Sequence, residues 1–193
     1  MELPIGQIIR VLWLCFGLYW LWGWRRVKSA RRSEPALPRL LKYWLPLAVA
    51  VLLLAGPDEW YAGSWLGQHL LPPSLLIALA GTALTALGVA FACWARYVLG
   101  RNWSSVVQVK QDHELIQRGP YAYVRHPIYS GLLLAFFGTA LAIGEWRGLL
   151  SVVIVFASFW FKLRLEERWM RESFGPVYEG YMQRVKALIP GVL

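Results

Sequence analysis

Charged residues are scarce in this chain of 193 residues: they make up 16% of it, against 58% hydrophobic residues. A soluble domain carries about 25% charged residues, so an ordinary soluble domain is excluded. The chain also lacks the apolar–polar alternation of a membrane β-strand, which excludes a β-barrel. Only helices and closed barrels satisfy their backbone hydrogen bonds in lipid. The sequence therefore predicts an all-α integral membrane protein.

Cysteine and acidic residues are also few. Cys15 and Cys93 have no metal-ligand spacing and cannot form a disulfide framework, so we expect buried thiols and no metal. The 11 acidic residues stand against 20 Lys and Arg, which leaves a net charge of +9. These basic residues cluster beside apolar runs, a pattern typical of membrane topology. We therefore expect membrane lipids, and no nucleic acid, as partners.

Apolar runs long enough to approach the roughly 20 residues of a membrane span occur five times. They lie at about 7–24, 41–56, 74–99, 128–144 and 147–164. A signal peptide is the alternative for the first run, but no basic segment precedes it and no small-residue cleavage site follows. The tail 165–193 is too polar to span, and Gly175-Pro176 divides it. We interpret this tail as a pair of cytoplasmic helices.

Loop charge predicts the orientation of the bundle. Residues 25–42 and 100–127 are rich in Lys and Arg, whereas residues 57–73 contain none. Because positive loops stay in the cytoplasm, we expect an outside N-terminus and a cytoplasmic C-terminus. We expect the protein to lie in the inner or plasma membrane, with its functional side in the cytoplasm.

Polar residues gather in four segments that this topology places on the cytoplasmic side: 109–115, 118–131, 164–169 and 178–185. Each has a simple structural explanation. Arg125 could bind a lipid phosphate, His126 could only cap the helix that follows Pro127, and the glutamates at 166 and 167 could form a solvated face. Their joint occurrence at one membrane face instead predicts a functional site.

The order of these motifs resembles the isoprenylcysteine carboxyl methyltransferase family, including its prokaryotic members, and more distantly the phospholipid N-methyltransferases. The resemblance covers about residues 96–191. It rests on NWS at 102–104, K-x-x-H-x-L at 110–115, G-x-Y-x-x-x-RHP-x-Y-x-G at 119–131, EE at 166–167, FG-x-x-Y-x-x-Y at 174–181 and a closing IP. We accordingly divide the chain into N-terminal transmembrane helices, residues 1–100, and a catalytic core, residues 101–193.

The resemblance implies methyl transfer from S-adenosylmethionine to a lipophilic acceptor, within a five-span transmembrane helix bundle whose C-terminal cytoplasmic helices cap the cofactor pocket. No Gly-rich nucleotide fingerprint occurs, and this family needs none. The implied cofactor-binding residues are Lys110, His113, Leu115, Gly119, Tyr121, His126, Pro127, Tyr129, Glu166 and Glu167. Adjacent helical residues point about 100° apart, so we expect Glu167 to face the pocket and Glu166 to touch a neighbouring segment.

The implied catalytic residues are Arg125, Glu167 and Arg184. A carboxylate acceptor needs an anion-binding group, which suits Arg125 and Arg184. An amine acceptor would need a base, and Glu167 would serve. The register of YEGYMQRV favours an isoprenylcysteine-like carboxylate, with its lipid part entering from the bilayer. The alternatives are a phospholipid or amine N-methyltransferase, a sterol-type membrane reductase and a non-catalytic membrane protein.

Overall fold

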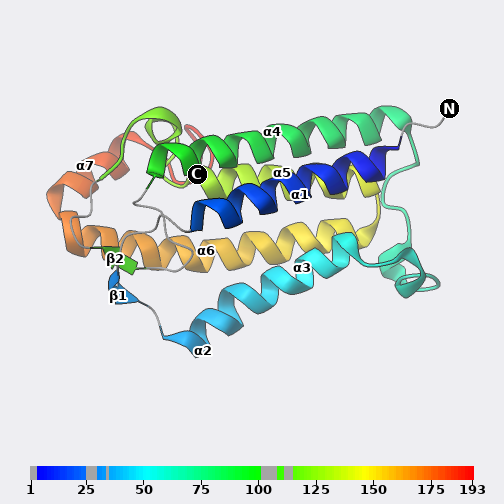
Figure 1. Ribbon diagram of the computed structural model, residues 1–193, viewed down its shortest axis with the longest axis horizontal. Helices are drawn as coiled ribbons and strands as arrows, with labels where there is room; N and C mark the ends of the chain where they lie inside the picture. Colours follow the sequence, from blue (N-terminus) through cyan, green and yellow to red (C-terminus); the bar gives the residue numbers. More distant parts are fainter. Residues whose placement is uncertain (1–3, 25–29, 34, 101–107, 111–114) are drawn as a thin grey trace.

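Long helices run side by side through most of the computed structural model, which describes residues 4–24, 30–33, 35–100, 108–110 and 115–193 (Figure 1). The elements are α1 (Ile5–Trp24), β1 (Ala30–Ser33), α2 (Ala36–Arg39), the π-helical turn η1 (Leu40–Trp44), α3 (Leu45–Ala55), the 3-10 turns η2 (Asp58–Trp60) and η3 (Trp65–Gly67), α4 (Leu75–Leu99), β2 (Gln108–Lys110), the 3-10 turn η5 (Gly119–Ala122), α5 (Pro127–Ile143), α6 (Trp146–Phe174) and α7 (Pro176–Arg184).

Four of the described helical segments are long and apolar enough to cross a membrane: Ile5–Gly23, Ala36–Ala55, Leu75–Leu99 and Trp146–Phe174. The predicted helical membrane protein is therefore confirmed. Helix α5 is apolar but has only 17 residues, short of the roughly 20 that span a bilayer core. The fifth span stays a prediction.

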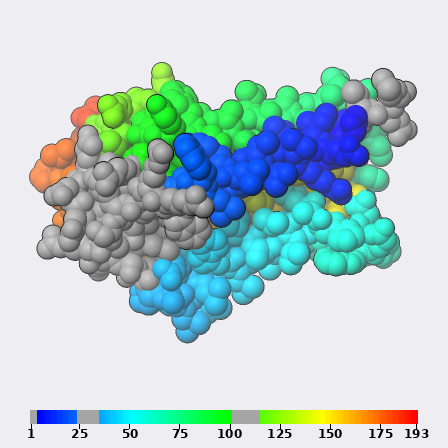
Figure 2. All heavy atoms as spheres, viewed as in Figure 1, coloured from blue at the N-terminus to red at the C-terminus, as the bar shows by residue number. Residues whose placement is uncertain are grey.

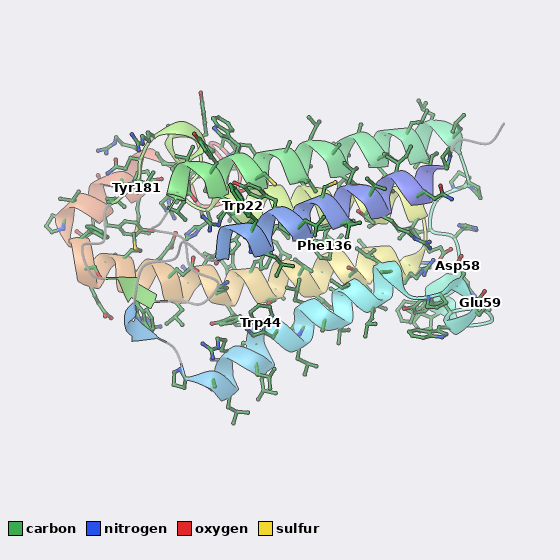
Figure 3. The ribbon with its side chains drawn as sticks, in the orientation of Figure 1. Trp22, Trp44, Asp58, Glu59, Phe136 and Tyr181 are labelled. Carbon is green, nitrogen blue, oxygen red and sulfur yellow. The ribbon has the colours of Figure 1, made fainter. Side chains whose placement is uncertain are left out.

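A short antiparallel ribbon of β1 and β2 departs from the all-helical prediction. Ala30 pairs with Lys110 and Ser33 with Gln108, with an irregularity between Ala30 and Arg32. The ribbon joins the two basic loops at one end of the bundle, which we call the site end. At the opposite end, His69 and Glu145 form an isolated bridge. Figure 3 shows Asp58 and Glu59 at that opposite end, far from Tyr181 of α7.

The second apolar segment begins earlier than predicted because its prolines are accommodated. Pro38 lies in the first turn of α2, where a missing N–H costs no hydrogen bond. Pro46 leaves the carbonyl of Lys42 without its usual helical donor, and the hydroxyl of Ser158 on α6 donates to that oxygen at 2.9 Å. Ser151 donates likewise to the carbonyl of Ala50 at 3.0 Å. The two serines thus join η1 and α3 to α6.

Helix α6 also exceeds its predicted length, since it continues unbroken to Phe174. No Gly or Pro occurs between residues 149 and 174, so nothing ends the helix near residue 164. The break comes at Gly175, whose φ of 50° lies in the left-handed region, and α7 starts at Pro176. The paired glutamates therefore lie on an extension of a membrane helix and not on a separate tail helix.

Close packing of α4 against α5 forms the centre of the bundle. Small residues at matching positions let the backbones approach, as is usual for helices in lipid. A Cβ built on Gly131 would lie 2.7 Å from the carbonyl oxygen of Gly88, and one on Gly138 would lie 2.6 Å from that of Gly81. Thr85 and Thr139 share a buried hydrogen bond of 3.2 Å at the same interface. These positions exclude any larger side chain.

Helix α1 lies against α4 and leaves much of its surface open (Figure 2). Leu14, Leu18 and Leu21 are exposed, as expected for side chains that face lipid. Cys15 is exposed on this helix too, so the prediction of two buried thiols is wrong for this residue. The apolar run gave no signal for which face of α1 would pack.

Candidate functional site

The RHP segment is held at the site end by the C-terminal chain. The backbone N–H of Arg125 donates to the carbonyl of Lys186 at 2.8 Å, and that of His126 donates to Ala187 at 3.0 Å. The hydroxyl of Ser130 donates to the carbonyl of Leu188 at 2.6 Å. Residues 186–188 thus lie alongside the entrance to α5, and they fix the direction in which the Arg125 and His126 side chains leave the backbone.

Arg125 and Glu167 form a buried ion pair at the centre of this site. Nη2 of Arg125 lies 2.5 Å and Nε 2.9 Å from Oε1 of Glu167, and the two side chains are 8% and 5% exposed. Nη1 of Arg125 donates to the carbonyl of Val185 as well. The guanidinium is therefore engaged on both sides by the protein itself. The interpretation of the glutamates as a solvated face does not hold for Glu167.

His126 lies between the two glutamates. Its Nε2 is 3.3 Å from Oε1 of Glu167, and its Nδ1 is 3.5 Å from Oε2 of Glu166. Residue 126 occupies the N-cap position of α5, yet its side chain makes no capping hydrogen bond. Burial lowers the pKa of this imidazole, but the hydrogen bonds and charges of the two carboxylates outweigh burial and raise it. The arrangement favours an imidazolium that donates from both nitrogens.

Glu166 and Glu167 diverge along α6 as the helical geometry predicts, and both reach the entrance to α5. Oε1 of Glu166 accepts a hydrogen bond from the hydroxyl of Tyr129 at 2.6 Å. The Tyr129 ring stacks on His126 with a centroid separation of 5.6 Å. The Glu166 side chain is 26% exposed, against 5% for Glu167. Glu166 is thus the carboxylate of this pair that keeps an open face.

Three tyrosines line the same end of the bundle and stay neutral. The hydroxyl of Tyr181 on α7 donates to the carbonyl of Tyr121 at 2.6 Å, and the rings of Tyr178 and Tyr181 meet edge to face at 5.9 Å. Burial raises the pKa of Tyr181 to about 12 and raises those of Tyr121 and Tyr178 further. They supply hydroxyl groups and flat surfaces, and they add no charge at neutral pH.

The remaining predicted residues differ in whether the structure places them near the site. Gly119 has a φ of 61°, which requires glycine, and Pro127 is buried at the start of α5. Leu115 is half-buried. Arg184 lies on the surface, where its Nη2 donates to Oε1 of Gln117 at 3.3 Å. It therefore does not join the cluster of Arg125, His126 and the two glutamates. His113 and the side chain of Lys110 lie outside the described residues.

Three cations outside the predicted site are buried or half-buried, namely Lys162, Arg96 and Arg147. Lys162 on α6 lies over the ring of Tyr129 with its Nζ 5.4 Å from the centroid. Arg96 on α4 donates to the carbonyl of Gly23 at 2.8 Å, which ties α1 to α4. Arg147 pairs with Asp58 and Glu145 at the opposite end. For Arg96 and Lys162 the available signal was a cation within an apolar run, because such a cation usually faces an interior or a partner.

The position of His126 predicts a pH-dependent stability. The pKa of His126 is higher in the folded protein than its ordinary value of about 6.5 in an unfolded chain. Protonated His126 therefore stabilises the fold fully below about pH 6.5, and this stabilisation is lost as pH rises through the pKa of the folded protein. We therefore expect the difference in unfolding temperature between the wild type and His126→Gln to be largest below about pH 6.5 and to narrow at higher pH. Thermal unfolding in detergent across a pH series measures this difference, and a constant difference would contradict the assignment.

Comparison with known proteins shows that the chain is similar to methyltransferases. Residues 76–177 match the family model described as phospholipid methyltransferase. The chain is 31% identical over 160 residues to the protein-S-isoprenylcysteine O-methyltransferase of Schizosaccharomyces pombe, with 77% of this chain and 66% of that protein covered. It is 30% identical over 167 residues to a probable protein-S-isoprenylcysteine O-methyltransferase of Oryza sativa subsp. indica, with 83% of each protein covered.

A solved structure has the same fold. It is that of the eukaryotic intramembrane Ras methyltransferase, isoprenylcysteine carboxyl methyltransferase, with a TM-score of 0.55 and 24% identity. The match covers 82% of this chain and 55% of the solved chain. This likeness concerns the fold, and the matched part of the solved chain is about half of its length.

Proposed function

The chain belongs to the isoprenylcysteine carboxyl methyltransferase family of membrane methyltransferases, and from this we propose that it transfers a methyl group from S-adenosylmethionine to the carboxylate of an isoprenylcysteine-like acceptor. The observation that supports this most directly is the buried cluster of Arg125, His126, Glu166 and Glu167. This cluster joins the N-terminal end of α5 to the C-terminal part of α6. Such a cluster puts polar chemistry within reach of a lipid-bound molecule.

The described residues fit the proposed cofactor. S-adenosylmethionine, when bound, supplies a methyl group on a cationic sulfonium and also carries an ammonium group. The partly exposed carboxylate of Glu166 suits a cationic group, and the neutral tyrosines and His126 suit adenine and ribose. The sequence-based expectation that Glu167 faces the pocket, where it would pair with the ammonium or the ribose, stays a prediction. The geometry favours Glu166, because Arg125 already neutralises Glu167.

The chain's own residues would orient the reactants and exclude water. Methyl transfer needs an acceptor oxygen aligned opposite the bond that breaks, at near-contact distance. The new bond joins that oxygen to the methyl carbon, and the electron pair of the broken bond stays on sulfur. A carboxylate acceptor gives up no proton, so no general base is required. We infer that Arg125 serves mainly to hold Glu167 and His126 in position.

The proposed membrane arrangement follows the sequence predictions. We propose that α5 is a fifth span, that the N-terminus is outside, and that the site end lies in the cytoplasm. The basic ribbon at that end supports this orientation. Residues 1–100 would form the N-terminal helices and 101–193 the catalytic core, with α7 and the C-terminal chain capping the cofactor pocket. The acceptor's hydrocarbon part would enter from the bilayer.

A panel of acceptors tests the function directly. Purified protein would be incubated with S-adenosylmethionine labelled in its methyl group and with a prenylated cysteine, a fatty acid or phosphatidylethanolamine. We expect base-labile methyl ester on the prenylated cysteine. Label on phosphatidylethanolamine instead would replace the proposal with N-methylation, which the description of the matching family model makes the second candidate. Binding of NADPH without methyl transfer would favour the reductase alternative.

Cofactor binding should separate two of the predicted residues. His126→Ala removes a group buried between both glutamates, so we expect binding of S-adenosylmethionine to fall at least tenfold, equivalent to about 1.4 kcal/mol. Arg184→Ala changes an exposed side chain outside the cluster, so it should leave binding of S-adenosylmethionine within twofold. A loss of turnover in this variant would support the acceptor-binding role that the sequence predicts for Arg184. Isothermal titration in detergent measures binding. Equal effects of the two substitutions on binding would contradict the assignment.

A further inference from the structure

Tyr181 joins α7 to the turn η5, which precedes the RHP segment (Figure 3). Its hydroxyl donates to the backbone carbonyl of Tyr121 at 2.6 Å, across 60 residues of sequence. Both ends of this hydrogen bond are buried, since Tyr181 is 2% exposed and Tyr121 is 7% exposed. A hydrogen bond in such a dry environment is stronger than one in water, so it fixes the backbone of Tyr121 relative to α7.

The turn η5 obtains from Tyr181 a donor that it does not supply itself. The N–H groups of Tyr123 and Val124 both donate to the carbonyl of Pro120, at 3.1 and 3.2 Å. The hydroxyl of Tyr181 donates to the next carbonyl along the chain, that of Tyr121. A buried carbonyl that loses its donor costs more than the hydrogen bond contributes. The conformation of this turn therefore depends on a side chain of another helix.

The side chain of Tyr121 extends from this turn into the site. It packs with Ala95 and Ile116, and burial raises the pKa of its hydroxyl, with a smaller contribution from the negative charge of Glu166. Tyr121 is thus within electrostatic reach of the carboxylate to which the proposed function assigns the cationic group of the methyl donor. A displaced Tyr121 backbone would move this phenol relative to Glu166.

The other end of the same segment is held independently of Tyr181. Nη1 of Arg125 donates to the carbonyl of Met182 on α7 at 3.4 Å, and the backbone N–H of Arg125 donates to the carbonyl of Lys186. In the described part of the chain, the hydroxyl of Tyr181 is the hydrogen bond that joins η5 to α7. Loss of this hydroxyl should therefore release the Tyr121 end and leave Arg125 in place.

We propose that Tyr181 is a positioning residue for the methyl donor, because its hydroxyl holds the turn of Tyr121 in the conformation that binds S-adenosylmethionine. This inference rests on the proposed function and adds to it a residue that touches neither reactant. Tyr121 is a predicted cofactor-binding residue, so the effect of Tyr181 falls on the donor. The KM for S-adenosylmethionine should depend on the hydroxyl of Tyr181, and the KM for the lipophilic acceptor should not.

Tyr181→Phe tests this role, because it removes the hydroxyl and keeps the ring that meets Tyr178 edge to face at 5.9 Å. We expect the Kd and the KM for S-adenosylmethionine to rise about tenfold, and the KM for N-acetyl-S-farnesylcysteine to stay within twofold. Isothermal titration in detergent and initial rates with each substrate varied in turn measure these values. Placing 4-aminophenylalanine at position 181 restores an N–H donor and should recover most of the donor binding.

Tyr61→Phe is the matched control. The hydroxyl of Tyr61 also donates to a backbone carbonyl at 2.6 Å, that of Leu52, but at the opposite end of the bundle. Each substitution removes one hydrogen bond, so both should lower the unfolding temperature by a similar amount, about 2–4 °C. Only Tyr181→Phe should weaken the binding of S-adenosylmethionine.

Three results would overturn the positioning role. They are donor binding within twofold of the wild type in Tyr181→Phe, an equal loss of donor binding in Tyr61→Phe, and a loss of stability in Tyr181→Phe far beyond that of the control, which would assign the hydrogen bond to folding alone. A wild type that binds no S-adenosylmethionine would instead overturn the proposed function.

Discussion

Replacing Glu167 by alanine is expected to lower the free energy of unfolding by about 3–5 kcal/mol and to abolish methyl transfer. The cause is Arg125, which is 8% exposed and would lose both of its hydrogen bonds to a carboxylate. A buried charge without its partner costs far more than the intact pair contributes. The unfolding temperature in detergent and the rate of methyl transfer are the two measurements. A fully stable Glu167→Ala protein would contradict the buried ion pair.

The double variant Arg125→Met, Glu167→Leu separates stability from function. Apolar side chains of similar volume remove both charges at once, and such replacements are often neutral or stabilising. We therefore expect the unfolding temperature to recover to near the wild-type value while methyl transfer stays absent. His126 would still face Glu166 in this variant, so any remaining binding of S-adenosylmethionine reports the contribution of that half of the cluster. Recovery of turnover together with stability would show that the pair is structural only.

Replacing Gly131 by leucine is expected to separate α4 from α5 and to prevent the protein from being isolated as a folded monodisperse species. A Cβ at this position would lie 2.7 Å from both the backbone nitrogen of Ala92 and the carbonyl oxygen of Gly88. Backbone atoms cannot rotate away as a flexible side chain can, so the helices must part. Overpacking costs about 1–3 kcal/mol even where side chains can adjust, and more is expected here.

Gly17→Leu is the control for this substitution. A Cβ built on Gly17 meets nothing within 4 Å, and the position lies in the middle of α1. Leucine is a better helix former than glycine by nearly 1 kcal/mol, so this variant should be at least as stable as the wild type. Size-exclusion profiles and unfolding temperatures of the two variants in the same detergent give the comparison. Equal behaviour of the two would mean that the α4–α5 contact is looser than the structure shows.

The sequence by itself determined the membrane class and most of the helices, because both depend on local properties. Apolar runs must be helical in lipid whatever they pack against. The break at Gly175-Pro176 was also predictable, since a left-handed glycine followed by proline ends a helix without help from other segments. Motif order pointed to the family, and its residues His126, Glu166 and Glu167 do meet in space.

Only the tertiary structure decided how the charges are shared. Whether Arg125 binds a substrate or Glu167 depends on a contact across 42 residues of sequence, and a pattern of residue types carries no such information. The same holds for residues 186 and 187, whose backbone carbonyls accept hydrogen bonds from the RHP segment. These backbone hydrogen bonds do not depend on which side chains residues 186 and 187 carry, so the sequence does not reveal them. Lys162 was one cation in an apolar run until Tyr129 was found beneath it. Local chemistry sets which segments enter the membrane, whereas the partner of each buried charge is set by packing between distant segments.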